Sequence, residues 1–476
     1  MRRFDNLAFL LTQPVALLGG GVSGLAVLRF LYERGARQIS VRDRAPFLSL
    51  SAEMQRYAGL PGVTFQCGED YLRRLNEPVI FRTPGIRPDL PALIDARGRG
   101  AVVLGEVGLF CELTPATLLA VTGSDGKTTT ATLTAALLRA ESERRAADGE
   151  TPFRVFLGGN IGQPLLSRLP EMSPGDYAVL ELSSFQLMDL SCAPLRAALL
   201  NVTPNHLNWH TDMTEYAAAK RRVLERAQRG VLNADNPYTA DWAREGDTLF
   251  SLTQSPRELR ERFGAAHDFV CLTGGHVCLV KGQTTTPLLS ADGLRLPGRH
   301  NLANLMAAVG LCDGPVAPTV FADVAASFQG VPHRLEYVGQ IGGVHCYNSS
   351  IDTTPARTAA ALDALPCRPV VLCGGSDKGV SYEPLADALL RRAGGVVLTG
   401  HTARAIEAAL TAHPLYERER LPMERVADFV QAVRTAHRMA GTGGTLLLSP
   451  ACASFDTFTD YGARGDAFRQ ILLEMR

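Results

Sequence analysis

Three stretches of the chain repeat one pattern, in which an apolar run is followed by a glycine-bearing turn and then by apolar residues at helical spacing. The first stretch has apolar runs at residues 14–18 and 78–81, and another that ends at Asp43. The second starts near Leu104, and the third near Gln329. Strands that alternate with helices in this way are typical of parallel sheets with helices on both faces.

The second stretch is the longest. Strands are expected at residues 117–122, 176–182 and 197–202, and a helix is expected after the first of them. The charged residues 142–151 that follow this helix are expected to form a surface loop. The third stretch has apolar runs at 369–373, 394–399 and 444–448, each ending in Gly or Ser. Such strand ends meet at the carboxyl edge of a parallel sheet, where ligands bind.

The length supports several domains, since 476 residues exceed what one hydrophobic core usually organises. The pattern predicts an α/β protein of three domains. These are a Rossmann-like domain at 1–104, a central P-loop ATPase-type domain at 105–329 and a second Rossmann-like domain at 330–476.

Composition narrows the class of ligand. The formal net charge is zero, so no basic surface points to nucleic acid or to an anionic membrane. The ten cysteines include no C-x-x-C pair, which argues against a zinc site or a disulfide framework and favours the cytoplasm. The apolar N-terminal run is interrupted by Gln13 and Pro14, so it is not read as a signal peptide, and no run is long enough to span a membrane. A small-molecule partner is expected.

The strongest chemical signal is the stretch VTGSDGKTTT at residues 121–130. Its glycines, Gly123 and Gly126, allow backbone N–H groups to converge on phosphate oxygens, and the helix that follows adds its N-terminal partial charge. Lys127 supplies a cation, and Thr128 or Thr129 can reach Mg²⁺. The alternative is an ordinary strand-to-helix turn with an exposed lysine. Because all these groups occur together after a strand, a phosphate-binding loop is the interpretation adopted.

Other polar residues at strand ends are less decisive. Glu181 ends an apolar run and is placed to hold Mg²⁺, but it could equally be a capping or ion-paired carboxylate. His206 follows a strand, and a single histidine is more often a surface or hydrogen-bonded core residue. His210 keeps that ordinary interpretation.

The turn at residues 19–24 matches G-x-G-x-x-G, and Asp43 lies where a ribose-binding acid would be expected. Taken alone, this favours NAD or FAD and leaves an oxidoreductase open. The pattern is weak, because any Rossmann-like domain needs glycines in this turn.

Taken together, several stretches resemble the Mur ligase superfamily over essentially the whole chain. ELSSFQL at 181–187 and LSPACAS at 448–454 are most similar to its D-glutamate-adding members. The remaining stretches are shared more widely across the superfamily and comprise GSDGKTT, GGNIG, NVTPNH, YAAAK, GRHNLAN, PHR and GGSDKG.

The resemblance implies an ATP-dependent ligase of peptidoglycan precursor synthesis, and so of cell division and cell shape. ATP would phosphorylate the carboxylate of UDP-MurNAc-L-Ala, and the amine of D-Glu would attack the acyl phosphate to form an amide. ATP and Mg²⁺, as two ions, would be the cofactors, and a cytoplasmic monomer is expected. Another ligase of the superfamily, such as a folylpolyglutamate synthetase, an NAD-dependent oxidoreductase and a non-catalytic nucleotide-binding protein remain alternatives.

The resemblance also implies roles for individual residues. ATP would be bound by Gly123, Ser124, Asp125, Gly126, Lys127, Thr128, Thr129, Asn301, Asn304 and Arg334. The UDP-sugar would be bound by Gly21, Val22, Ser23, Asp43, Arg44, Thr83, Pro84, Gly85, Asn160 and His206. D-Glu would be bound by Thr353, Lys378, Ser454 and Tyr461. Metal ions would be held by Thr128, Thr129, Glu181, His206 and Lys220, the last as a carbamate, and catalysis would rest on Lys127, Glu181, His206 and Lys220. Without the resemblance, Lys220 would be interpreted as a solvated lysine on a helix.

Two departures from the superfamily stand out. Where many members have N-D-S-K-A-T, this chain has NSSIDT at residues 348–353, so the acid and the lysine of that motif are replaced by Ser349 and Ile351. Asp352 is a candidate substitute for the acid. Pro204 and Asn205 replace an acidic pair before His206, which predicts a weaker second metal site.

Overall fold

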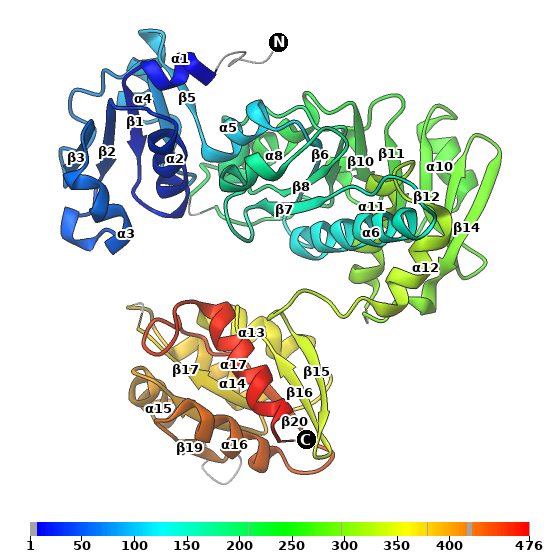
Figure 1. Cartoon of the computed structure of the whole chain (residues 1–476). Helices are drawn as coiled ribbons and strands as arrows, with labels where there is room; N and C mark the ends of the chain where they lie inside the picture. The colour runs from blue at the N-terminus through cyan, green and yellow to red at the C-terminus, as the bar shows by residue number, and fades with distance from the viewer. Residues whose placement is uncertain (1–6, 208, 297, 378, 417–420, 476) are drawn as a thin grey trace. The chain divides into compact units, whose positions relative to one another are not determined.

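The computed structural model describes residues 7–207, 209–296, 298–377, 379–416 and 421–475. The chain forms two compact units, Met1–Phe328 and Gln329–Arg476, which are described separately (Figure 1). The first unit contains a five-stranded and a nine-stranded sheet, and the second contains a six-stranded sheet. This three-sheet α/β architecture confirms the predicted fold class. The domain boundaries expected near residues 104 and 329 stay predictions.

The first sheet has the strand order β3-β2-β1-β4-β5, and all of its described pairings are parallel. Strands β1 and β4 are buried along their whole length because helices cover the sheet. Its strands are β1 Val15–Leu18, β2 Ile39–Asp43, β3 Val63–Cys67, β4 Val79–Arg82 and β5 Val102–Leu104. The helices of this region are α1 Leu7–Thr12, α2 Val22–Glu33, α3 Ala52–Gln55, α4 Pro91–Gly98 and α5 Glu106–Leu113.

The second sheet has the order β14-β13-β12-β11-β10-β9-β6-β8-β7. Its strands are β6 Thr117–Thr122, β7 Val155–Gly159, β8 Tyr177–Glu181, β9 Arg196–Leu199, β10 Arg229–Asn233, β11 Thr248–Ser251, β12 Asp268–Thr273, β13 His276–Lys281 and β14 Thr284–Ser290. Its helices are α6 Lys127–Ala147, α7 Ser184–Leu187, α8 Met213–Arg221, α9 Pro237–Asp241, α10 Pro256–Phe263, α11 Arg299–Cys312 and α12 Pro318–Ser327.

Helices α6 and α11 lie side by side against this sheet (Figure 1). Leu137 of α6 and Leu305 of α11 share a buried cluster with Leu119 and Val121 of β6. Burying each such side chain stabilises the fold by about 1.5–3 kcal/mol, which fixes the start of α6 relative to the end of β6. Strands β12, β13 and β14 pair antiparallel, which the sequence pattern did not predict.

The charged stretch after residue 141 is not the expected loop over its first half, because α6 continues to Ala147. Glu141 is buried and pairs with Arg144, three residues along the helix, at 2.9 Å. Arg145 lies 3.5 Å from the same carboxylate. These ion pairs on one helix face support further turns of α6, and Gly149, at φ 77°, follows its end.

The sheet of the second unit has the order β15-β16-β20-β17-β18-β19, with β15 and β16 antiparallel and the other pairs parallel. Its strands are β15 Glu336–Ile341, β16 Val344–Asn348, β17 Val370–Gly374, β18 Gly395–Thr399, β19 Met423–Arg425 and β20 Thr445–Leu448. Its helices are α13 Pro355–Ala364, α14 Glu383–Arg392, α15 Ala403–Ala412, α16 Phe429–Ala440 and α17 Tyr461–Leu473.

The described residues also form five 3₁₀ turns: Phe47–Ser49, Arg56–Gly59, Leu165–Glu171, Arg222–Leu224 and Ala291–Gly293. Within the part of the chain that the structure describes, no helix is both long enough and apolar enough to cross a membrane.

Candidate active site

The loop between β6 and α6 has the backbone of an anion-binding turn. Gly126, directly before α6, adopts φ 81°, a left-handed conformation that favours glycine. A Cβ at this position would lie 2.2 Å from Oδ1 of Asn304, so a side chain is also excluded by packing. The first N–H groups of α6 have no acceptor within the helix and form a site for an anion. A left-handed glycine directly before a helix N-terminus is the backbone that anion-binding loops use, and phosphate binding at this loop stays a prediction.

Two lysines meet at this loop. Nζ of Lys127 donates to the carbonyl oxygens of Gly123 and Ser124, both at 2.9 Å. Nζ of Lys220, on α8, donates to the same carbonyl of Gly123 at 2.7 Å. Lys220 is only 1% exposed, so the interpretation as a solvated lysine is wrong. Burial and then the charge of Lys127 lower the pKa of Lys220 well below its usual value, which favours the neutral amine.

Glu181 provides a buried acceptor beside the loop. It ends β8, in register with Val121 of β6, and is 1% exposed. Its Oε1 accepts a hydrogen bond from Nδ2 of Asn160 at 2.7 Å. Its Oε2 is buried and has no hydrogen-bond partner among the described residues. An unpaired buried carboxylate oxygen is costly, and a hard cation is a fitting partner for it.

A metal at this place would rely on the nucleotide as well as on the protein. No group of three or more His, Cys, Asp or Glu side chains in the described part of the chain is arranged to hold a metal ion. Thr128 is buried at the start of α6, and Thr129 is half-buried next to it. Mg²⁺ often takes only one or two protein ligands together with phosphate oxygens and water, so Glu181 and one of these hydroxyls fit such an ion.

The two histidines considered from the sequence, His206 and His210, differ in their exposure and in their contacts. His206 is exposed, has a left-handed backbone at φ 55° and packs edge-on against the ring of Phe185. Burial and the charges of Lys127 and Lys220 lower its pKa, which keeps the imidazole neutral and able to bind a cation. His210 is 2% exposed and lies between Glu215 at 3.0 Å and Ser184 at 2.9 Å. It is the hydrogen-bonded core histidine that the sequence suggested.

Asn201 and Tyr216 position the loop, and the sequence analysis assigned neither. Oδ1 of Asn201 accepts from the N–H of Asp125 at 2.9 Å, and its Nδ2 donates to the carbonyl of Asp125 at 3.2 Å. The hydroxyl of Ser124 lies 2.9 Å from that of Tyr216 and donates to the carbonyl of Thr203. The Ser124 side chain is thus engaged with the protein. Asn201 directly follows an apolar run, which was the available signal.

Two of the predicted ATP-binding residues, Asn301 and Asn304, are on α11. Asn304 is buried against Gly126, and its Nδ2 lies 3.5 Å from Oδ1 of Asn301. The structure therefore brings Asn304 to the phosphate loop, although the two are far apart in sequence, and Asn301 lies next to Asn304.

The glycine turn of the first sheet is tightly built. A Cβ on Gly24 would lie 2.0 Å from the carbonyl oxygen of Gly19, and one on Gly19 would lie 2.3 Å from Oγ1 of Thr83. Asp43 accepts from the N–H of Gly20 at 2.6 Å and from that of Ala45 at 2.8 Å. Asp43 therefore holds the glycine turn with Oδ2, while its Oδ1 accepts within its own loop.

Most of the other predicted sugar-nucleotide residues lie in or next to this turn, whereas Asn160 and His206 lie in the region of the phosphate loop, beside Glu181 and Phe185. Gly21, Val22, Gly85 and Arg44 are exposed, whereas Ser23 and Pro84 are half-buried. Ser23 and Pro84 line a small pocket with Glu106 and Gln186. One oxygen of Glu106, Oε1, is buried without a hydrogen-bond partner among the described residues. Burial raises the pKa of Glu106 to about 7.

A buried ion pair joins the two regions of the first unit. Arg82, at the end of β4, donates from Nε to Oδ2 of Asp189 at 2.9 Å and from a terminal nitrogen to Oδ1 at 2.6 Å. The side chain of Arg82 is 1% exposed. Arg87 pairs with Glu215 of α8 at 2.7 Å. These contacts hold the glycine turn and the phosphate loop in one compact unit.

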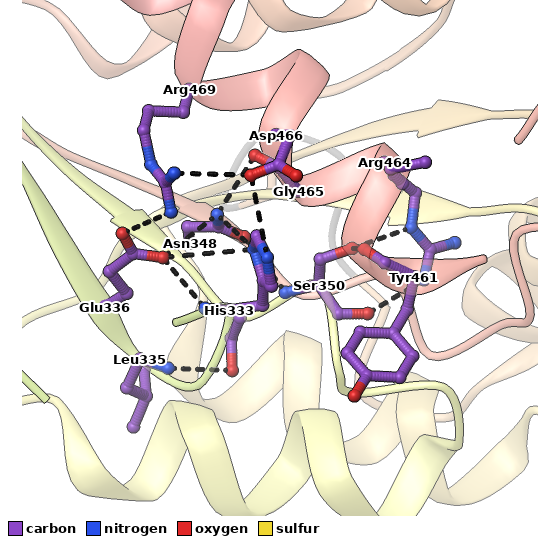
Figure 2. Close-up of polar contacts among 12 residues, drawn as sticks. His333, Leu335, Glu336, Asn348, Ser350, Tyr461, Arg464, Gly465, Asp466 and Arg469 are labelled. Atoms are coloured by element: carbon purple, nitrogen blue, oxygen red, sulfur yellow. Dashed lines mark hydrogen bonds and ion pairs between the residues drawn. The ribbon is translucent and has the colours of Figure 1, made fainter. Parts of the chain in front are cut away.

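In the second unit, a buried guanidinium organises the predicted D-glutamate residues. Arg464 of α17 donates to the hydroxyl of Ser350 at 3.0 Å and to the carbonyls of Cys452 and Ala453 at 3.1 Å. The hydroxyl of Ser350 donates to the carbonyl of Tyr461 at 2.7 Å (Figure 2). The segments that carry Thr353, Ser454 and Tyr461 are thereby tied together. Lys378 lies outside the described residues.

The same unit contains a polar cluster at His333, next to Arg334. Nδ1 of His333 lies 3.0 Å from Nδ2 of Asn348, and Oε2 of Glu336 accepts a hydrogen bond from the backbone N–H of His333 at 2.8 Å (Figure 2). Arg469 donates to Glu336 at 2.6 Å. His333 has φ 63°, so the cluster fixes a left-handed turn directly before Arg334, which is exposed.

Asp352 does not present an acid at the surface of the NSSIDT loop. It is 6% exposed, and its Oδ2 accepts from the hydroxyl of Ser449 at 2.8 Å. Burial raises its pKa to about 6. The expectation that Asp352 replaces the missing acid is therefore not supported. Arg357 was not singled out from the sequence, yet its Nη1 donates to the carbonyl of Ile351 at 3.0 Å, so a guanidinium lies at this loop.

Comparison with known proteins agrees with this geometry. Residues 121–312 match the Mur ligase middle domain, and residues 333–452 match the Mur ligase glutamate ligase domain. The UDP-N-acetylmuramoylalanine–D-glutamate ligase of Ruminiclostridium cellulolyticum is 36% identical, covering 98% of this chain and 97% of the relative. The protein of the same name from Symbiobacterium thermophilum is 38% identical, covering 97% of this chain and 98% of the relative.

The fold is also that of a solved structure, the UDP-N-acetylmuramate-alanine ligase of Thermotoga maritima. The two chains share 17% identity at a TM-score of 0.52, over 98% of this chain and 100% of the other. The full-length similarity at well above 30% identity and the two domain matches lead to one conclusion: the chain belongs to the Mur ligase family, in the group of the UDP-N-acetylmuramoylalanine–D-glutamate ligases.

Proposed function

We propose that the chain uses ATP to join D-glutamate to UDP-N-acetylmuramoyl-L-alanine, as the names of its relatives indicate for those proteins. The observation that carries the proposal is the meeting of Lys127, Lys220 and the buried Glu181 at the start of α6. A lysine, a helix N-terminus and a buried carboxylate are the groups that phosphoryl transfer requires.

The reaction proceeds in two steps. The terminal phosphoryl group of ATP passes to the alanine carboxylate, which breaks the bond to ADP and forms an acyl phosphate. The amine of D-glutamate then attacks the carbonyl carbon, the amide bond forms and inorganic phosphate leaves with the electron pair of the broken C–O bond. Lys127 and the N–H groups of α6 stabilise the negative charge of the transferring group.

Glu181 with Thr128 or Thr129 would hold one Mg²⁺, and His206 with Lys220 would hold a second. Mg²⁺ supplies positive charge that neutralises the phosphate oxygens. Lys220 can bind Mg²⁺ only after its side chain has become an anion. Its neutral amine adds CO₂, a proton is released, and the resulting carbamate is an anion. The lowered pKa of Lys220 favours this addition, because only the unprotonated amine has the lone pair that attacks carbon.

On the sugar side, the turn at residues 19–24 would receive the diphosphate, with Ser23 and Thr83 beside it. In the second unit, Thr353, Ser454 and Tyr461 would surround D-glutamate. We propose that Arg357 supplies the cation for one of its carboxylates, since the guanidinium lies at the loop in which Ile351 replaces the superfamily lysine. The enzyme would act as a monomer in the cytoplasm, where ATP is available.

The test is phosphate release by the purified chain with ATP, Mg²⁺ and UDP-N-acetylmuramoyl-L-alanine. D-glutamate should stimulate release, and L-glutamate, L-lysine and meso-diaminopimelate should not. Mass spectrometry should detect the sugar nucleotide extended by one glutamate. Stimulation by a different amino acid would assign the chain to another ligase activity of the superfamily, and turnover with a nicotinamide cofactor would replace the proposal altogether.

A further inference from the structure

Two cysteines in the first unit are in direct contact. Sγ of Cys111 donates to Sγ of Cys192 at 3.0 Å, although the residues are 81 positions apart in the sequence. Cys111 is on α5, and Cys192 is in the segment between α7 and β9. A disulfide has an S–S bond of about 2.05 Å, so an approach of about 1 Å would join them.

One member of the pair lines a cavity. Both side chains are half-buried. Cys111 lines a cavity of about 330 Å³ together with Glu112, Ser191 and Arg226. Neither cysteine is among the residues assigned to ATP, the sugar nucleotide, D-glutamate or metal. A small oxidant can therefore reach the pair without entering the proposed active site.

The surroundings of Cys111 lower the reactivity of its thiol. The hydrogen bond to Cys192, and then burial, raise the pKa of the Cys111 thiol well above its usual value. A protonated thiol is a weak nucleophile, so ordinary electrophiles should react slowly with Cys111. Once one sulfur is oxidised, however, the second is already in contact with it.

We propose that Cys111 and Cys192 form a redox-sensitive dithiol that hydrogen peroxide converts into a disulfide. One sulfur attacks a peroxide oxygen, the O–O bond breaks, and a sulfenic acid and water form. The second sulfur then displaces the hydroxyl group of the sulfenic acid, and the S–S bond forms with release of a second water. Each sulfur loses one electron, and hydrogen peroxide accepts both.

The disulfide would clamp α5 to the segment before β9. Helix α5 follows β5, the last strand of the first sheet, and precedes β6, which leads into the phosphate loop. The crosslink would therefore restrain the connection between the two sheets of the first unit. This inference does not depend on the proposed function, since it concerns only the two thiols.

Peptide mapping of the full-length chain tests the proposal. The reduced protein is exposed to hydrogen peroxide, its remaining thiols are alkylated, and it is digested without reduction. The expected result is a peptide that links Cys111 to Cys192, the loss of two of the ten thiols, and recovery of both with dithiothreitol. Because the measurement uses the unmodified sequence, it needs no variant to fold.

Cys271 and Cys278 provide a control within the same molecule. They face each other on β12 and β13, but the thiol of Cys278 is directed to the carbonyls of Thr273 and His276. They should remain separately alkylatable when the Cys111–Cys192 link has formed. In Cys192→Ser, Cys111 should stay unlinked under the same exposure. If the exposed Cys367 is oxidised while Cys111 and Cys192 are still recovered as two alkylated peptides, the proposal is wrong.

Discussion

Lys127 and Lys220 donate to one and the same carbonyl oxygen, that of Gly123, at 2.9 and 2.7 Å. Two ammonium groups at a single acceptor repel each other, which is part of the reason that the pKa of Lys220 is lowered. The arrangement is stabilised when an anion arrives or when one lysine loses its charge. The negative charge of the proposed polyphosphate would relieve this repulsion.

Lys127→Ala should abolish most of the ligase activity with the fold retained. Loss of one preorganised charge in a phosphate site costs roughly 10²- to 10³-fold in kcat. The measurement is phosphate release at saturating substrates, with circular dichroism to confirm folding. Lys281→Ala is the matched control, because Lys281, at the end of β13, pairs with Asp313 and is not part of the phosphate loop. Near-normal turnover by Lys127→Ala would remove the loop from the mechanism.

Carbamylation of Lys220 predicts that activity depends on dissolved CO₂. At fixed pH, phosphate release should fall in buffer stripped of CO₂ and should recover when bicarbonate is added. Lys220→Arg keeps the positive charge but does not form the carbamate, so it should be inactive and insensitive to bicarbonate. An active arginine variant, or a wild-type rate that ignores CO₂, would show that Lys220 acts as an ammonium.

The buried carboxyl group of Glu106 should make the folded chain less stable as the pH rises. Its pKa is about 7 in the folded chain, against 4.5 for an ordinary glutamate, so the folded state binds the proton more tightly. The free energy of unfolding should therefore fall as pH rises from about 4.5 to 7, by about 3 kcal/mol at most, and then level off. Denaturant titrations across this pH range measure the change in the free energy of unfolding.

Glu106→Gln should flatten this dependence, because the amide stays neutral. The variant should be more stable than the wild type at pH 8, and the difference should vanish near pH 4.5. Glu143→Gln, on the exposed face of α6, is the control and should leave the profile unchanged. An unaltered profile in Glu106→Gln would assign the titration to another group.

Arg357→Ala should raise the KM for D-glutamate by about 10- to 100-fold, the value of one charge-assisted hydrogen bond. The KM for the sugar nucleotide should change little, and Arg357→Lys should recover part of the loss. Arg391→Ala is the control, since Arg391 pairs with Asp387 on α14. Equal KM values for D-glutamate in the wild type and in Arg357→Ala would assign the cation to another residue.

Much of the site could be predicted because it lies at strand ends. The apolar runs before Gly123, Glu181 and Asn201 form the neighbouring strands β6, β8 and β9, whose carboxyl ends share one edge of the sheet. A single sequence shows such runs directly, since parallel strands are buried on both faces. The antiparallel strands β12 to β14 were missed because their runs are short and mixed in polarity.

Contacts between distant segments could not be predicted from the pattern. The bond from Lys220 to Gly123 joins residues 97 positions apart, and the bonds from Arg464 join α17 to Ser350, 114 positions away. Helical spacing gives the position of a charged residue on a helix but not what that face packs against. For this reason the sequence pattern alone, without the resemblance, predicted a solvated Lys220. For the same reason Arg464 was overlooked and Asp352 was expected to replace the missing acid.

The bidentate contact between Arg82 and Asp189 has a consequence for attempts to divide the enzyme. A fragment that ends near residue 104 would contain Arg82 but not Asp189, so its guanidinium would have no counter-ion. The complementary fragment would contain the Asp189 carboxylate without its cation. Neither half should be a useful stand-alone module, and exchange of the N-terminal region between homologues should succeed only when both members of the pair are transplanted together.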